Sequence, residues 1–274
     1  MLVAKSQEGL WGTALLGFPL IRALAQIGDR STMRIIGNAA SDFAGSLVFQ
    51  HGSPSPLRPG EVDPVWAYWQ MRTQGMDLAQ TIETMLGALG GDDLLVEAHR
   101  VLKAMGQVSV PYLADALKHP RGKGPLSCQR NVAWILGELK AKEAVEPLRD
   151  MLRESLLTGN SQLGERIASA LGQIGDPSAL PELLTAAQST DFLLQVSAIC
   201  ALGKLADPRA EHLLLALLSN HPDAVVRYRA AEALRTAGTA SAIPVLEQRL
   251  EVETDRGTRA RMQTTLQALR QRMR

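Results

Sequence analysis

Hydrophobic residues recur along the chain at the three- and four-residue spacing of amphipathic α-helices, and the helical stretches meet at similar short junctions. The junction "ALGQIGDPSAL" (170–180) has a near copy, "ALAQIGDRSTM", at 23–33, and more distant copies at 135–144 and 201–210. When the first two copies are extended to 18 residues, 9 positions are identical. The pattern therefore predicts a chain built from repeated helical hairpins.

Each junction carries residues suited to ending one helix and beginning the next. Gly175 has no Cβ, so it can adopt the left-handed conformation that closes a helix. Asp176 can then accept hydrogen bonds from the first backbone N–H groups of the following helix. Pro177 fits the first turn because its missing N–H has no partner there. We therefore place a helix boundary at each copy of the junction.

The copies are spaced like the units of an α-solenoid. With Gly172 as the reference, successive intervals of 31 to 35 residues separate the equivalent positions Lys103, Gly137, Gly172, Gly203 and Arg235. A single hairpin cannot bury its own apolar face, so the pattern predicts an all-α solenoid of about six hairpins in a right-handed superhelical stack. The second helices share three apolar columns: Leu94, Cys128, Leu163, Leu194 and Val226; Leu24, Leu102, Leu136, Leu171, Leu202 and Leu234; Ile27, Met105, Leu139, Ile174, Leu205 and Ala237.

Three segments carry a family resemblance: "ALGQIGDPSALPELL", "ALGKLADPRAEHLL" and "VRYRAAEAL". They resemble HEAT-like repeats of the type also found in phycobilin lyases, over roughly 76–250 and more weakly over 15–45. The resemblance implies stacked helical hairpins whose second helices line a concave surface. The sequence departs from the repeat pattern in one respect, because the Val-Arg pair that opens the second helix is present only as Val226-Arg227.

The longest interruption of the repeat pattern is a proline-rich segment. Residues 51–64 hold four prolines, which excludes a helix interior, and we interpret them as an exposed loop. This loop separates a divergent N-terminal hairpin region, 1–50, from the main repeat array, 65–255. Residues 256–274 contain six arginines and predict a final helix whose polar outer surface caps the array.

Composition narrows the class of protein. The formal net charge of +1 gives no overall attraction to nucleic acid or to an anionic membrane. Two cysteines imply no disulfide framework, so we expect a cytoplasmic protein. The apolar segment 10–21 resembles a signal peptide, but the repeat motif follows it directly, so we interpret it as a buried helix. No apolar run reaches the roughly 18 residues of a membrane span.

No catalytic or metal-binding motif is recognisable. The five histidines show no HExxH spacing, and neither cysteine has neighbouring ligands at metal-site spacing. Cys128 falls on an apolar column and is expected in the core, whereas Cys200 falls on the polar side of its helix, one turn before Lys204. We therefore expect no metal, no cofactor and no catalysis by the chain itself.

Opposite the apolar columns, each second helix presents positions that we assign to the concave surface. A solvated helix face explains their charges but not Trp134, because a large aromatic side chain exposed to water is typical of a binding site. A second aromatic group, Trp66, Tyr68 and Trp69, follows the proline-rich loop; we interpret it as packing, with a binding patch as the alternative. The candidate binding residues on the concave surface are Arg100, Arg130, Asn131, Trp134, Glu138, Arg166, Gln173, Lys204, Tyr228, Arg229 and Glu232.

Three functions fit these features. The preferred one is a non-catalytic interaction scaffold or adaptor that binds a protein partner on the concave surface. The second follows from the resemblance: in a phycobilin lyase-like or chromophore-handling protein, Arg130 and Arg166 would pair with bilin carboxylates and Trp134 would stack on the conjugated system. The third is nucleic-acid binding through the basic loop 118–125 and the C-terminal arginines, which the low net charge and acidic residues such as Glu232 argue against.

Overall fold

The computed structural model describes residues 78–90, 95–120 and 124–273. Within these ranges the regular elements are helices, and none is a strand. The predicted N-terminal hairpin region and proline-rich loop lie outside the described residues, as do Trp66, Tyr68 and Trp69. The α-helices are α5 (Leu78–Leu89), α6 (Leu95–Ala104), α7 (Val110–Lys118), α8 (Pro125–Glu138), α9 (Val145–Thr158), α10 (Ser161–Ile174), α11 (Leu180–Ala186), α12 (Phe192–Leu205), α13 (Glu211–Asn220), α14 (Ala224–Ala237), α15 (Ala242–Val252) and α16 (Arg256–Arg272).

The chain divides into two compact units, Met1–Ala104 with Arg121–Cys128, and Met105–Pro120 with Gln129–Arg274. In the first unit α5 packs against α6. The Cys128 thiol is fully buried there and donates to the Leu86 carbonyl, which agrees with its expected place in the core. None of the helices in the described ranges is long and apolar enough to cross a bilayer.

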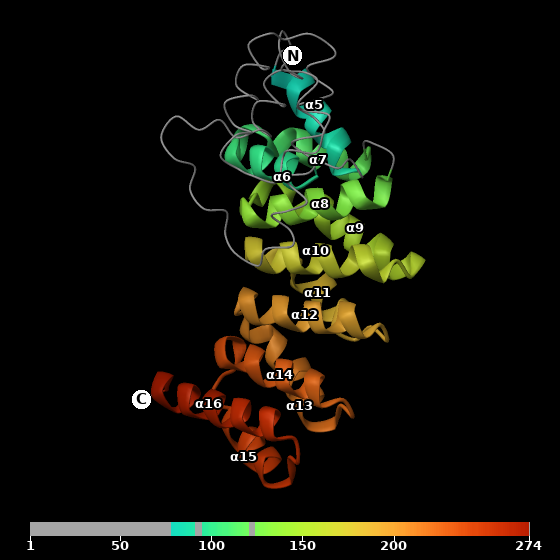
Figure 1. Cartoon of the computed structure of the whole chain (residues 1–274). Helices are drawn as coiled ribbons and strands as arrows, with labels where there is room; N and C mark the ends of the chain where they lie inside the picture. The colour runs from blue at the N-terminus through green and yellow to red at the C-terminus, as the bar shows by residue number, and fades with distance from the viewer. Residues whose placement is uncertain (1–77, 91–94, 121–123, 274) are drawn as a thin grey trace, which may run out of the picture. The chain divides into compact units, whose positions relative to one another are not determined.

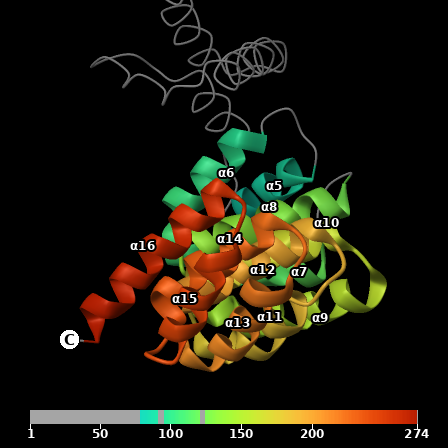
Figure 2. The ribbon, with the colours of Figure 1, turned by 90° about the horizontal axis from the view of Figure 1, so that it is seen from below.

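In the second unit, successive helices alternate between two layers. The first helices of the hairpins are α7, α9, α11, α13 and α15, and the second helices are α8, α10, α12, α14 and α16. Helix α10 packs on α12, α12 on α14, and α14 on α16 (Figure 1). Figure 2 shows α9, α11 and α13 on one side of this stack and α10, α12 and α14 on the other. The predicted all-α architecture of repeated hairpins is therefore confirmed.

The junction after α10 folds as its residues predict, with one difference. Gly175 adopts a left-handed conformation with φ of 74°, and its N–H donates to the Leu171 carbonyl. The Asp176 carboxylate accepts from the Ser178 N–H, but this caps a 3-10 turn over Pro177–Ala179 and not α11 itself. The proline therefore opens a short turn that lets the chain reverse direction before α11 begins.

The equivalent junction after α12 uses the same geometry without glycine. Ala206 has φ of 55°, and its N–H donates to the Leu202 carbonyl. A non-glycine residue in this region is sterically strained, because its Cβ crowds the backbone. The position therefore keeps its left-handed conformation at some cost in stability.

The apolar columns form the core of the stack. Leu136, Leu171, Leu202 and Leu234, together with Leu102 in the first unit, are at most 1% exposed. The third column is less uniform, because Met105, Leu139 and Leu205 lie at or just beyond helix ends and are only half-buried. In the column predicted from Leu94 to Val226, Leu94 lies outside the described residues, and Cys128, Leu163, Leu194 and Val226 are each buried.

Three of the second helices, α8, α10 and α12, approach the next second helix closely at a glycine. A methyl group on Gly172 would lie 2.6 Å from the Cα atom of Ala201, and one on Gly203 would lie 2.8 Å from the Cα atom of Ala233. A methyl group on Gly137 would lie 2.9 Å from the Cα atom of Ala170 on α10. Contacts this short do not occur between real side chains and backbone, so each of these positions excludes any side chain. The glycines at the repeat register are therefore packing residues as well as helix punctuation.

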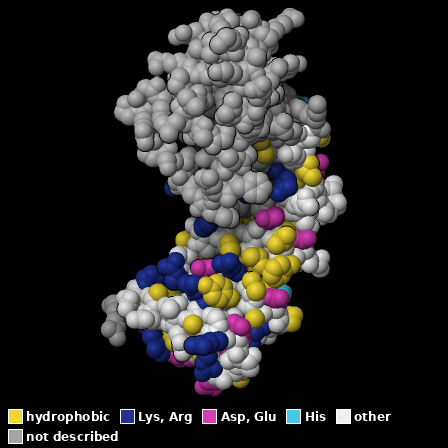
Figure 3. Space-filling view, in the orientation of Figure 1, with side chains coloured by type: hydrophobic (Ala, Val, Ile, Leu, Met, Phe, Trp, Pro, Cys, Tyr) yellow, Lys and Arg dark blue, Asp and Glu magenta, His cyan; other side chains and the backbone are white. Residues whose placement is uncertain are grey.

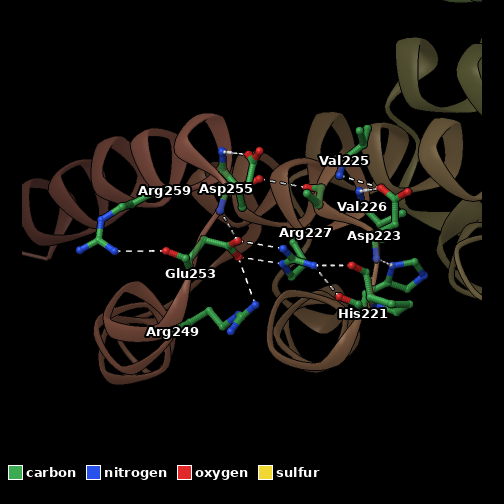
Figure 4. Close-up of polar contacts among 12 residues, drawn as sticks. His221, Asp223, Val225, Val226, Arg227, Arg249, Glu253, Asp255 and Arg259 are labelled. Atoms are coloured by element: carbon green, nitrogen blue, oxygen red, sulfur yellow. Dashed lines mark hydrogen bonds and ion pairs between the residues drawn. The ribbon is translucent and has the colours of Figure 1, made fainter.

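A buried ion pair joins the last two hairpins (Figure 4). The Arg227 guanidinium donates to both carboxylate oxygens of Glu253, at 2.7 and 2.8 Å. Its remaining nitrogen donates to the carbonyls of His221 and Pro222, and Arg249 also reaches Glu253. The side chains of Arg227 and Glu253 are 8% and 0% exposed, respectively. These hydrogen bonds hold the pKa of Glu253 at about 2, well below its usual value.

Candidate functional site

Trp134 lies on the exposed side of α8, as its position opposite the apolar columns predicts. Ala133 and Ile135 on either side of it are fully buried, so the helical rotation turns Trp134 outward, and its side chain is 39% exposed. The guanidinium carbon of Arg166, on α10, lies 5.6 Å from the centroid of the Trp134 ring. This distance is within the range of cation–π attraction, so the pair bridges two successive hairpins.

A second aromatic–cation cluster lies on α14 and α16. Tyr228 is half-buried, with the guanidinium carbons of Arg229 and Arg261 lying 5.4 and 4.9 Å from its ring centroid. Arg261 also donates to the Tyr228 hydroxyl. Glu232 joins the cluster because its carboxylate accepts from Arg229 at 2.8 Å and lies 3.7 Å from Arg261. The cluster thus fixes an aromatic ring between two cations at the surface.

Cys200 on α12 lies within the electrostatic influence of this cluster. Burial raises the pKa of its thiol, while the nearby positive charge of Arg229 acts in the opposite direction. The thiol is therefore protonated at neutral pH, and it lacks the depressed pKa of a catalytic cysteine. Lys204, the candidate activating residue in the sequence, is exposed. The described residues also include no group of His, Cys, Asp and Glu side chains that could hold a metal ion.

We call the exposed and half-buried polar and aromatic side chains of the second helices the second-helix face. Its contacts bring Trp134 together with Arg166, and Tyr228 together with Arg229 and Glu232. The Arg100 side chain lies outside the described residues. The face comprises Arg130, Asn131, Trp134, Glu138, Arg166, Gln173, Cys200, Lys204, Tyr228, Arg229, Glu232 and Arg261.

The repeated hairpins match a known family model. The model describes HEAT repeats, and it matches residues 110–193 and 180–267, which together span more than half of the chain. The chain belongs to the HEAT-repeat family. The predicted repeat resemblance is therefore confirmed.

Relatives with related repeats carry bilin-related names. The HEAT-repeat chain is 31% identical over 142 residues to the phycocyanobilin lyase subunit alpha of Nostoc sp., a match that covers 46% of the chain and 51% of that protein. It is 36% identical over 121 residues to the bilin biosynthesis protein PecE of Mastigocladus laminosus, covering 42% and 44%. Its match therefore spans about half of the length of these relatives.

Among solved structures, one similar fold is the complex of CpcE and CpcF of phycocyanin lyase from Nostoc sp. The match has 20% sequence identity and a TM-score of 0.43, and it covers 81% of the HEAT-repeat chain and 98% of the other.

Arg261 is the member of the second-helix face that sequence reasoning missed. It was assigned with the C-terminal arginines to a capping helix, yet it contacts both Tyr228 and Glu232. Arg261 follows Tyr228 by 33 residues, which is one HEAT-repeat period, and this spacing is the signal that could have revealed the contact. The last HEAT helix therefore contributes to the same face as the helices before it.

Proposed function

We propose that this HEAT-repeat chain is a binding module that holds a partner protein on its second-helix face. The observation that carries the proposal is the exposed ring of Trp134, oriented by Arg166 across two hairpins. Trp and Arg are enriched among the residues that dominate the energy of protein interfaces. Burial of the exposed part of Trp134 by a partner would remove apolar surface from water and stabilise a complex.

The arrangement of the face supports a preformed binding surface. Tyr228 is held by Arg229 and Arg261, as Trp134 is held by Arg166. Side chains that are already oriented lose little conformational entropy on binding. Two fixed aromatic groups three hairpins apart, on α8 and α14, therefore suit recognition of an extended partner surface.

An affinity pull-down from a lysate of the source cells tests the proposal. The comparison is between wild type, the Trp134→Ala/Arg166→Ala variant, and a control, Tyr112→Ala/Arg209→Ala, which removes an aromatic residue and an arginine outside the second helices. We expect a protein enriched by wild type and by the control but lost by the Trp134 variant, with all three equally helical. Equal enrichment by all three proteins would show that the partner does not bind through Trp134 and Arg166 on the second-helix face.

A second candidate is a bilin-handling function. The similarity to a phycocyanobilin lyase subunit and to a bilin biosynthesis protein favours it, although each match covers about half of the relative. A bilin carries carboxylates and a conjugated system, for which an arginine beside a partly exposed indole is a chemically suitable site. Titration with phycocyanobilin tests this function: a change in the visible spectrum that Arg166→Ala weakens supports it, and an unchanged spectrum with wild type rejects it.

A further inference from the structure

The low net charge of the chain conceals an uneven distribution of charge between the two helix layers. The second helices, α8, α10, α12, α14 and α16, contain eleven Lys or Arg residues and three Glu. The first helices, α7, α9, α11, α13 and α15, contain four Lys or Arg residues and eight Asp or Glu. The second helices therefore carry a surplus of eight positive charges, and the first helices a surplus of four negative charges.

Most of the cations on the second helices have no carboxylate partner within the described chain. Arg227, Arg229, Arg261 and Arg270 are ion-paired. The other seven have no carboxylate of residues 78–90, 95–120 or 124–273 within ion-pair distance, and among these residues Arg259 and Arg272 donate to backbone carbonyls. The remaining five are Arg130, Arg166, Lys204, Arg235 and Arg256.

The first helices show the opposite arrangement. Their three arginines, Arg149, Arg153 and Arg249, all pair with a glutamate. Within the described residues, the arginines of the first helices are therefore all neutralised by carboxylates, whereas seven of the eleven cations of the second helices are not. Figure 3 shows Lys and Arg side chains gathered over the C-terminal helices, with acidic and hydrophobic side chains between them.

The kinds of side chain on the basic layer favour protein carboxylates over a nucleic-acid backbone. Ten of its eleven cations are arginines, whose planar guanidinium binds a carboxylate through two parallel hydrogen bonds. Trp134 and Tyr228 lie among them, as in the centre of a protein interface. Glu138 and Glu232 interrupt the basic surface. Their negative charges would repel the continuous row of phosphates of a nucleic-acid backbone.

We propose that the second-helix face and the basic side chains beside it bind an acidic, carboxylate-rich segment of a partner protein. The inference deepens the proposed binding function and rests on it. The uncompensated cations attract the segment and set its orientation, while the aromatic side chains supply the contact area. Such a surface accelerates encounter with an acidic partner and makes the affinity depend on salt.

Fluorescence anisotropy with a labelled polyglutamate peptide tests the proposal. The face variant combines Arg166→Gln, Lys204→Gln, Arg235→Gln and Arg256→Gln. The matched control combines Lys118→Gln, Lys140→Gln, Lys142→Gln and Arg209→Gln, four exposed cations outside the second helices. Both variants change the net charge equally, so they separate the position of the charge from its total.

We expect wild type to bind polyglutamate, with an affinity that falls as salt rises. The face variant should weaken binding by at least about tenfold and the control by less than about twofold. Equal loss in both variants, or no binding by wild type, overturns the proposal. Displacement of polyglutamate by single-stranded DNA of equal charge at lower concentration also overturns it, and assigns the surface to nucleic acid.

A Trp134→Ala variant separates this inference from the proposed function. The variant keeps all the cations, so polyglutamate should still bind, with an affinity within about threefold of wild type. Loss of polyglutamate binding only in the face variant, together with no partner in the pull-down, would support the acidic preference and reject the aromatic anchor. Capture of a protein that depends on Trp134, without binding of polyglutamate, would support the aromatic anchor and reject the acidic preference.

Discussion

Gly172 and Ala201 lie so close together that a methyl group added to Gly172 would stand 2.6 Å from both the Cα and the Cβ atoms of Ala201. The contact joins α10 to α12, and the equivalent contact between Gly203 and Ala233 joins α12 to α14. Backbone atoms on both sides leave little room for adjustment. The absence of a side chain at this position of α10 and α12 therefore sets how closely α10, α12 and α14 stack.

Substitution of Gly172 by alanine should destabilise the protein. Overpacking against α12 is expected to cost about 1–3 kcal/mol, more than the gain in helix propensity. Gly87→Ala is the matched control, because Gly87 also lies inside a helix but has no atom within 4 Å of an added methyl group. That variant should be as stable as wild type, or more stable by up to about 1 kcal/mol. Urea unfolding followed by circular dichroism compares them; a Gly172→Ala protein as stable as the control would contradict the packing role.

The helical repeat and its junctions were predictable because they depend on local chemistry. Gly175 ends one helix and Asp176 caps the turn that follows it, as these two residue types alone predict. The close contact of Gly172 was not predictable, because it depends on the distance between helices from different repeats. Sequence register alone identified Gly172 as a repeated residue, and the structure adds the reason for its small size.

The candidate site was predictable to a similar extent. Trp134 was expected on the face opposite the apolar columns, and its exposed side chain lies there. The position of Arg166 over its ring and the contact of Arg261 with Tyr228 depend on side-chain conformation and on the spacing between repeats. Periodicity therefore identifies a face, but it does not identify the pairs of residues that the face brings together.

The buried pair of Arg227 and Glu253 predicts a large effect of a single neutral substitution. Glu253→Gln removes the negative charge and leaves the Arg227 guanidinium buried without a counter-ion, which should cost about 3 kcal/mol at neutral pH. The control Arg209→Gln breaks an exposed ion pair and should change the free energy of unfolding by less than about 0.5 kcal/mol. Chemical denaturation at pH 7 measures both.

The same pair predicts a dependence on pH with a definite sign. The pKa of Glu253 is about 2 in the folded protein, compared with 4.5 for a glutamate without these interactions. The carboxylate therefore contributes its full stabilisation above about pH 4.5. That contribution is lost as the pH falls toward 2. The difference in unfolding free energy between wild type and Glu253→Gln should therefore shrink over this interval. A difference that stays constant down to pH 2 would be inconsistent with the ion pair.

The two helix-ending positions Gly175 and Ala206 should respond in opposite directions to exchange of their residues. Both have positive φ, at 74° and 55°. Gly175→Ala introduces a strained Cβ and should cost about 1 kcal/mol, whereas Ala206→Gly relieves such strain and should stabilise by up to about 1 kcal/mol. Thermal unfolding of the two variants measures the shifts; changes of the same sign would show that the left-handed geometry does not control stability at these junctions.

Cys200 should behave as an unreactive thiol. Burial raises the pKa of its thiol, and Arg229 partly offsets that effect, so alkylation at pH 8 should be slower than that of a free cysteine. Arg229→Gln removes the favourable charge and should slow the reaction further. Iodoacetamide kinetics on the native protein provide the measurement, with Cys200→Ser as the control, because the buried Cys128 should not react. Faster alkylation of Cys200 than of free cysteine would contradict this prediction and indicate a nucleophilic thiol.

Site-specific photo-crosslinking in a lysate of the source cells tests whether the second-helix face binds a protein partner. A photoreactive residue is introduced as Trp134→p-benzoylphenylalanine and, in a matched protein, as Tyr112→p-benzoylphenylalanine on the first helices. We expect a discrete crosslinked protein from position 134 that is absent from position 112. Crosslinking of the same protein from both positions, or from position 112 alone, would contradict it.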